Sequence, residues 1–225
     1  MYLYTKENEK IKFITSKCNK IGGEEKTNVY KISNNTCLKI NNSADGIDLE
    51  TLMLLKSLNL KNFYEIYDLY YNQKRKPKAY TMKYYENEEI DILTEESQYT
   101  INNLYSLLST VNTLNENNIL ISDTHSENVI LNKEKIIIID ADLYRINRFF
   151  QKSSLEFHNV DALRYLFESL YIYALKKYHS EYYNMFTEAR IKNLFQLYSS
   201  SQVRDTFSTI SIYKYPIDYI RSKVR

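Results

Sequence analysis

Four side chains that can bind a metal ion or move a proton lie between Ile121 and Asp142. Asp123, His125 and Asn128 share one polar segment, and Asp140 follows further along the chain. Magnesium prefers oxygen ligands and takes only one or two from protein when phosphates and water supply the rest. Asn128 and Asp140 could be those ligands. Asp123 would then be free to accept a proton from an attacking hydroxyl.

The residues around these side chains predict a loop followed by a hairpin. Asn128 precedes the apolar run 129–131, a polar turn follows, and residues 136–139 are four isoleucines. Continuous β-branched residues suit a strand buried on both faces, and the polar gap suits a turn. Because a hairpin folds the chain back, we expect Asp140 to lie beside the loop that holds Asp123 and Asn128.

This stretch is similar to a known family. The spacing D-x-x-x-x-N, followed by two apolar runs and I-I-D, resembles the catalytic loop and metal-binding segment of protein-kinase-like phosphotransferases. Where protein kinases carry H-R-D, residues 121–123 read I-S-D, and where they carry D-F-G, residues 140–142 read D-A-D. His125 stands where protein kinases have a lysine. The pattern D-x-H-x-x-N is similar instead to the aminoglycoside and choline kinase branch.

The resemblance implies a role for each of these residues. Asp123 and His125 would be catalytic, and Asn128, Asp140 and Asp142 would bind Mg²⁺. His125 could contact the γ-phosphate of ATP, or it could only brace the loop backbone. Asp142 could be a second metal ligand, or a carboxylate that caps the residues after it.

Residues 11–40 alternate apolar and polar side chains around turn signals, which predicts three antiparallel strands. Gly22 and Gly23 lie at the first turn, where a bare backbone could approach a phosphate closely. A plain hairpin turn is the alternative. Compared with the kinase pattern G-x-G-x-x-G-x-V, residues 22–29 keep the first glycine and the valine, and Glu24 replaces the second glycine.

A lysine and a glutamate follow in the order that kinases use. Lys39 lies in a strand between two apolar neighbours, and Glu50 lies in the next segment, which has helical spacing. The resemblance implies that this pair would hold the lysine against the α- and β-phosphates of ATP. Taken singly, a strand lysine is a solvated residue and a helix glutamate a partner for the helix dipole.

Two further strands, 63–71 and 78–85, complete a predicted five-stranded sheet with one helix. Lys83, Tyr84 and Tyr85 then fall where kinases join their lobes and bind the adenine edge through the backbone. Packing is the simpler role for the two tyrosine rings.

The second half of the chain reads as mainly helical. An amphipathic helix over 96–117 leads to the catalytic loop, and a strongly apolar helix contains residues 160–173. Asp161 resembles the acid with which kinases brace the catalytic loop; helix capping is the alternative. Further helices are predicted over 181–198 and 202–210.

Together these features predict an α+β, two-lobed, protein-kinase-like fold. Residues 1–86 would form a small antiparallel β-sheet lobe plus one helix that covers the nucleotide. Residues 87–225 would form a reduced, mainly helical lobe with the catalytic loop and metal site.

Composition excludes some functions. The 225 residues carry 30 Lys and Arg against 28 Asp and Glu, and a net charge of +2 gives no reason to expect a nucleic-acid partner. No apolar run approaches the roughly 18 residues of a membrane span, and the N-terminus lacks a signal-peptide core, so we expect a cytoplasmic protein without a membrane partner. Cys18 and Cys37 are expected to be buried free thiols.

The predicted function is transfer of the γ-phosphate of ATP to a hydroxyl, with Mg²⁺ as cofactor. A Ser/Thr protein kinase is the first hypothesis. A small-molecule kinase is the second, because only a short segment separates Asp142 from Asp161 and no A-P-E motif is present. A pseudokinase scaffold is the third, since glycines and the H-R-D histidine are missing. The sequence leaves the acceptor and the oligomeric state open.

Overall fold

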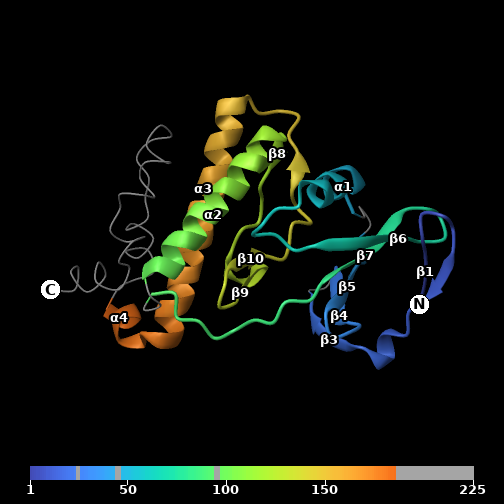
Figure 1. Ribbon diagram of the computed structural model, residues 1–225, viewed down its shortest axis with the longest axis horizontal. Coiled ribbons are helices and arrows are strands. Elements are labelled where there is room, and N and C mark those ends of the chain that lie inside the picture. Colours follow the sequence, from blue (N-terminus) through green and yellow to red (C-terminus); the bar gives the residue numbers. More distant parts are fainter. Residues whose placement is uncertain (24–25, 44–46, 94–96, 186–225) are drawn as a thin grey trace. The chain divides into compact units, whose positions relative to one another are not determined.

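The computed structural model describes residues 1–23, 26–43, 47–93 and 97–185 (Figure 1). The chain divides into two compact units, Met1–Glu86 and Asn87–Arg225. The first unit is an antiparallel sheet with one α-helix, and the second is mainly helical with two small two-stranded sheets. The predicted α+β class, with a sheet-rich first part and a mainly helical second part, is confirmed.

The sheet of the first unit is wider than predicted. Its seven strands in the described residues have the order β2-β1-β6-β7-β5-β4-β3, and neighbouring strands pair antiparallel. The strands are β1 (Tyr2–Tyr4), β2 (Lys10–Lys12), β3 (Asn19–Gly22), β4 (Thr27–Lys31), β5 (Thr36–Asn41), β6 (Ile66–Tyr71) and β7 (Pro77–Lys83). Sequence reasoning missed β1, which is too short to show alternation. It also missed that β2 pairs with β1 in an edge hairpin.

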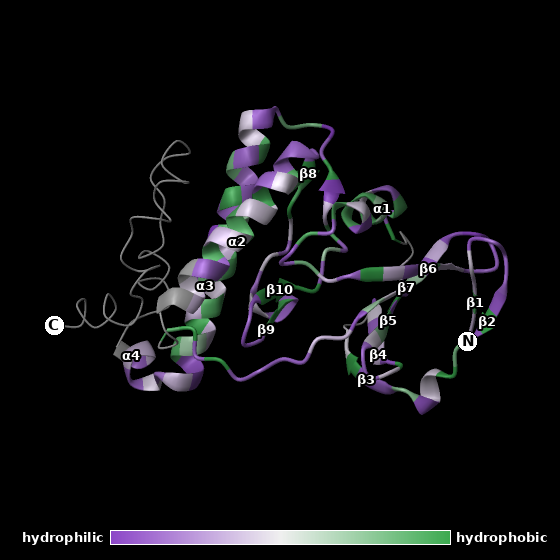
Figure 2. Ribbon diagram, in the orientation of Figure 1, coloured by the Kyte–Doolittle hydropathy of each residue, from purple (hydrophilic) through white to green (hydrophobic). Residues whose placement is uncertain are grey.

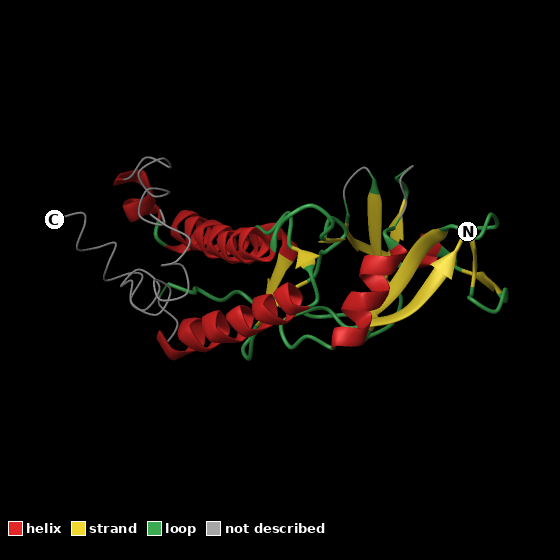
Figure 3. Cartoon of the chain, turned by 90° about the horizontal axis from the view of Figure 1, so that it is seen from above, coloured by secondary structure: helices red, strands yellow, loops and turns green. Residues whose placement is uncertain are grey.

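One α-helix, α1 (Leu49–Leu58), lies beside this sheet (Figure 3). It begins where predicted because Asp48 is an N-cap whose carboxylate accepts a hydrogen bond from Thr51 N at 3.2 Å. It ends at Asn59, which adopts the left-handed conformation with φ of 45°. A short 3₁₀ turn, η1 (Thr15–Lys17), connects β2 to β3.

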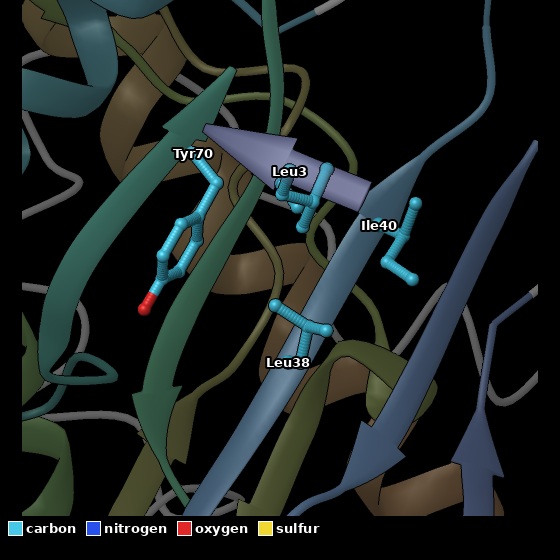
Figure 4. Close-up of a cluster of buried hydrophobic side chains, with 5 residues drawn as sticks. Leu3, Leu38, Ile40 and Tyr70 are labelled. Carbon is cyan, nitrogen blue, oxygen red and sulfur yellow. The ribbon is translucent and has the colours of Figure 1, made fainter. Parts of the chain in front are cut away.

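The strand β5 is buried on both faces. Leu38 and Ile40 join Leu3, Tyr70 and Ala79 in an apolar cluster, four members of which are labelled in Figure 4. Successive side chains of a strand point to opposite faces. Lys39 therefore projects away from this cluster.

The second unit is built on two long helices that pack on each other, α2 (Ser97–Glu116) and α3 (Lys152–Tyr178). The remaining elements are β8 (Ile119–Leu120), the 3₁₀ turn η2 (Ser126–Asn128), β9 (Val129–Leu131), β10 (Ile136–Ile138), β11 (Arg145–Ile146) and α4 (Ser180–Met185). The predicted hairpin is confirmed, because β9 and β10 pair antiparallel with Ile138 opposite Val129. The pairing of β8 with β11 was not predicted.

Hydrophobic and hydrophilic residues alternate along α2 and α3 (Figure 2). Among the described helices, none combines the length and the apolar character that a membrane crossing requires. The predicted helices over 181–198 and 202–210 lie outside the described residues, except for the part within α4.

The two cysteines differ in environment. Cys37 is 3% exposed, its Sγ lies 3.6 Å from the carbonyl oxygen of Met82, and burial raises its pKa to about 11. Cys18 is only partly buried, so the expectation of two buried thiols is wrong for this residue. Both are free thiols.

We therefore predict that Cys18 and Cys37 react at very different rates. At pH 8 a thiol with a pKa near 11 is only about one-thousandth thiolate, and the thiolate is the nucleophile. A disulfide reagent that releases a chromophore should label one thiol per folded chain quickly and the second only after denaturant is added. Cys18→Ser should remove the fast phase. A fast phase that survives in Cys18→Ser would contradict the assignment.

Candidate functional site

Asp123 stands in an unusual backbone conformation, with φ of 58°. Among residues with a side chain, Asp and Asn tolerate this left-handed region best. One group holds the residue there: Asn128 Nδ2 donates to the carbonyl oxygen of Asp123 at 2.7 Å and to its Oδ2 at 3.1 Å. A single amide thus fixes both the backbone and the carboxylate of Asp123.

His125 makes contacts within the same loop. It is the N-cap of η2, and its Nδ1 accepts a hydrogen bond from Glu127 N at 3.3 Å. Its Nε2 lies 3.0 Å from Asn128 Nδ2 and 3.4 Å from Asp123 Oδ1. These contacts favour the bracing role for His125; contact with a γ-phosphate stays a prediction.

The hairpin brings Asp140 to the same place. The N–H of Ile139 donates to the carbonyl oxygen of Asn128 at 2.9 Å, so Asp140 begins directly beside Asn128. One carboxylate oxygen of Asp140, Oδ1, accepts a hydrogen bond from Asp142 N at 3.0 Å, which ties the D-x-D segment into a turn.

The pKa of the buried Tyr144 hydroxyl is affected by the carboxylates of Asp140 and Asp123. Burial raises the pKa of Tyr144 well above its usual value, and the charges of Asp140 and Asp123 raise it further. The hydrogen bonds of Asn128 hold Asp123 beside it, and the backbone bond from Ile139 N to Asn128 O brings the chain at Asp140 to the same residue, as the hairpin predicted.

The oxygen atoms present fit magnesium. Nδ2 of Asn128 is used within the loop, and in the described part of the chain no protein donor contacts its Oδ1. Together with Asp140 this gives two oxygen ligands, which suits an ion that keeps water and phosphate ligands. Among the described residues no group of three or more His, Cys, Asp or Glu could hold a metal ion.

Sequence reasoning missed the residue that ties the loop to the helix behind it. Asn159, on α3 and fully buried, accepts a hydrogen bond from Ile121 N at 2.8 Å. The acid predicted for this role, Asp161, instead lies 2.7 Å from Arg164, and Arg164 also pairs with Glu168 at 2.8 Å. Neither prediction for Asp161 holds, because it lies well inside α3 and Gln151 is the N-cap.

A pocket of about 660 Å³ opens beside Asp123, between the loop 121–127 and one face of α3. Four carboxylates line it, against one lysine: Asp123, Glu127, Asp161, Glu168 and Lys176. The Arg164 guanidinium that bridges two of these acids leaves four negative charges against two positive ones when histidines are neutral. The pocket therefore favours a positively charged occupant.

In the first unit, Lys39 is 2% exposed. It pairs with Val29 of β4 and Tyr80 of β7, so it lies inside the sheet rather than at an edge. Burying an ammonium group costs several kcal/mol unless partners compensate, so the reading of Lys39 as a solvated strand lysine is wrong. Glu50 lies in the first turn of α1 and is exposed. Their ion pair stays a prediction.

The glycine pair is explained in part by the hairpin itself. Gly23 has φ of +99°, and a Cβ there would lie 2.4 Å from the carbonyl oxygen of Thr27. At Gly22 the nearest atom is Val29 Cβ at 4.0 Å, an ordinary contact. The turn requires glycine only at position 23. Glu24 lies outside the described residues.

The predicted adenine-binding segment has two of its donors in use. The N–H of Lys83 donates to Glu65 O at 2.9 Å, and that of Tyr84 donates to Asn35 O at 2.8 Å. The ring of Tyr84 lies under the ammonium of Lys31 at 3.9 Å. Burial, aided by nearby Glu65, raises the pKa of Tyr85 to about 12. Packing is thus the observed role of both rings.

No model of a known protein family matches this chain, and no curated protein sequence does. Among solved structures, the chain is similar to the kinase PK-1 of the Cydia pomonella granulovirus, with 19% identity over 67% of this chain and 71% of that chain, at a TM-score of 0.49. It is also similar to the Legionella pneumophila Lpg2603 kinase bound to IP6, with 13% identity over 76% and 67% of the two chains, again at a TM-score of 0.49. Both are kinases, the class that the sequence resembles.

The two glycines give a matched pair of variants. We predict that Gly23→Ala lowers the free energy of unfolding by more than about 1 kcal/mol, since the new Cβ meets backbone and the φ is unfavourable. Gly22→Ala should change it by less than about 0.5 kcal/mol. Thermal unfolding of both variants measures this. Equal melting temperatures for the two would show that the turn does not need glycine at position 23.

Proposed function

We propose that this protein is an ATP- and Mg²⁺-dependent phosphotransferase that moves the γ-phosphate of ATP to a hydroxyl group. The observation that carries the proposal is the double hydrogen bond from Asn128 Nδ2 to the backbone and carboxylate of Asp123. It directs Asn128 Oδ1 away from the loop and holds Asp123 ready as a proton acceptor. Such a pairing of an oriented base with a metal ligand is what phosphoryl transfer requires.

In this proposal Asn128 and Asp140 hold Mg²⁺, and Asp142 contributes on the phosphate side. The ion would neutralise charge on the phosphates of ATP. Asp123 orients the acceptor hydroxyl and takes its proton as the phosphoryl group is transferred, and His125 keeps the Asp123 carboxylate in place. The side chain of Asp123 is 48% exposed and is therefore accessible to an incoming acceptor.

The first unit would supply the contacts to the nucleotide. Lys39, held by Glu50, would neutralise the α- and β-phosphates; its burial supports a role beyond solubility. The turn at Gly22 and Gly23 would cover the phosphates. The segment Lys83, Tyr84 and Tyr85 would bind adenine through its backbone. The N–H groups of Lys83 and Tyr84 already donate to the carbonyl oxygens of Glu65 and Asn35, so other backbone groups of the segment would make these contacts.

The acceptor defines two versions of the function. A serine or threonine hydroxyl of a protein is the first, as the resemblance to protein kinases implies. The second is a small hydroxyl compound that carries positive charge. The acidic pocket beside Asp123 favours it, because the carboxylates that line the pocket attract positive charge.

Transfer of the γ-phosphate is the first test. With labelled ATP and Mg²⁺, we expect label on a generic protein substrate or on a hydroxyl-bearing amine, and Asp123→Asn should lower the rate by about 10²- to 10⁴-fold. Asp68→Asn, an exposed aspartate on β6, is the matched control and should retain the rate. Undiminished label with Asp123→Asn would refute the mechanism. Binding of Mg²⁺ and ATP without transfer would favour the scaffold alternative.

The acceptor class is tested by charge. If the acceptor is cationic, Glu127→Gln should raise the KM for the acceptor several-fold and make that acceptor KM less dependent on salt. The KM for ATP should stay unchanged. Glu134→Gln, in the exposed turn between β9 and β10, is the control. Equal KM values for charged and uncharged hydroxyl acceptors in the wild type would exclude recognition by charge.

A further inference from the structure

Both polar atoms of the Asn159 side-chain amide make hydrogen bonds, including two to the backbone at the start of the catalytic loop. Its Oδ1 accepts from Ile121 N at 2.8 Å, and its Nδ2 donates to Ile119 O at 2.7 Å and to Asn115 Oδ1 at 2.6 Å. The residue has no exposed surface. One side chain therefore satisfies a backbone donor and a backbone acceptor on either side of Leu120.

The orientation of this amide is fixed by its partners. Ile121 N–H can only donate and the Ile119 carbonyl can only accept, so the oxygen of Asn159 must face the first and the nitrogen the second. No carboxylate can reproduce both contacts while it is ionised. The site therefore requires a group that donates and accepts at once.

A second contact holds the other side of Asp123. Thr124 Oγ1 donates to the carbonyl oxygen of Ala162 at 2.8 Å, one turn along α3 from Asn159. The left-handed Asp123 thus lies between two attachments to the same helix, at residues 121 and 124. A backbone in a sparsely populated conformation persists only where its surroundings hold it.

We propose that Asn159 and Thr124 are positioning residues for phosphoryl transfer: together they fasten the loop on both sides of Asp123 to α3, and position 159 requires an amide that a carboxylate cannot replace. This rests on the proposed function. Neither residue touches the reacting groups; both act through the placement of Asp123. Misplacement of a reacting group by about 1 Å can cost about 10²-fold in rate.

Asn159→Asp is the most specific test, because the two side chains have the same shape. Asn115, whose Nδ2 has no hydrogen-bond partner among the described residues, can turn over and donate to the new carboxylate. The Ile119 carbonyl cannot, so an ionised oxygen faces a carbonyl oxygen at the 2.7 Å contact. The wild-type partners of this amide are all uncharged groups.

The loss of kcat in Asn159→Asp should depend on pH. Burial and the facing carbonyl raise the pKa of the introduced acid above its usual 3.9, so the defect is complete above the raised pKa and is relieved as the pH falls through it. A protonated acid can again donate to Ile119 O. The ratio of Asn159→Asp to wild-type kcat should therefore rise as the pH is lowered from 8.5 to 5.5. For Asn159→Ala the ratio should stay flat.

We expect Asn159→Asp at pH 8 to lower kcat by about 10- to 100-fold with little change in the KM for ATP. A kcat within twofold of wild type, or a pH-independent ratio for a folded Asn159→Asp, would overturn the proposal for Asn159. If this variant does not fold, Thr124 carries the test. Thr124→Val should lower kcat severalfold and Thr124→Ser should restore most of it, because the hydroxyl returns.

Thr113→Val is the matched control. Thr113 Oγ1 donates to Ser109 O at 3.2 Å within α2, so this substitution also removes a hydrogen bond from a threonine hydroxyl to a backbone carbonyl, but away from the loop. It should leave kcat unchanged. A fall in kcat equal to that of Thr124→Val would mean that the loss is general destabilisation, and would overturn the assignment of Thr124.

Amide hydrogen exchange separates this proposal from the proposed function. In Asn159→Ala, the Ile121 amide should exchange at least about tenfold faster than in the wild type, whether or not the protein transfers phosphate, since its acceptor is gone. Unchanged protection at Ile121 would overturn the attachment of the loop to α3 by Asn159. Faster exchange in a protein whose wild type transfers no label would uphold this attachment and reject the proposed phosphotransferase function.

Discussion

The geometry of the candidate site depends on the amide group of Asn128. Its Nδ2 donates to the carbonyl oxygen and the carboxylate of Asp123. The backbone carbonyl oxygen of the same residue accepts a hydrogen bond from Ile139 N as the hairpin returns. Backbone and side chain of one residue are thereby joined to the strand that leads to Asp140. Without this amide, the left-handed Asp123 would have no local partner that fixes both its main chain and its carboxylate.

Other asparagine side chains in the second unit also hydrogen-bond to the backbone. Asn159 fastens β8 and the start of the loop to α3, and Asn103 on α2 accepts from Ile136 N at 2.6 Å at the start of β10. Asn147 and Asn118 exchange hydrogen bonds where β11 meets β8. Strands of two or three residues leave many backbone groups unpaired, and a side-chain amide can serve both a donor and an acceptor. The short strands are thus attached to the long helices by side chains as well as by packing.

The parts of the molecule that could be predicted from sequence are those fixed by local pattern. The isoleucine run after a polar turn predicted the β9–β10 hairpin, and the hairpin predicted that Asp140 would lie beside Asn128. The short β1 and the β8–β11 pair were missed, because two or three residues show no periodicity. The partners β8 and β11 are also distant in sequence. The resemblance to kinases predicted Asp161 as the loop brace because an acid has that role in the family, and residue type alone does not show which position on α3 faces the loop. On α3, the side chain in position to reach Ile121 belongs to Asn159.

The central claim is that Asn128 and Asp140 bind a divalent ion together with ATP, and binding of Mn²⁺ in place of Mg²⁺ tests it most directly. Titration of the full chain, with bound Mn²⁺ followed by electron paramagnetic resonance, should show ATP-dependent uptake of the ion. That uptake should be lost or weakened at least about tenfold in Asp140→Asn and in Asn128→Ala that remain folded. Equal uptake by the wild type and both variants would contradict the account.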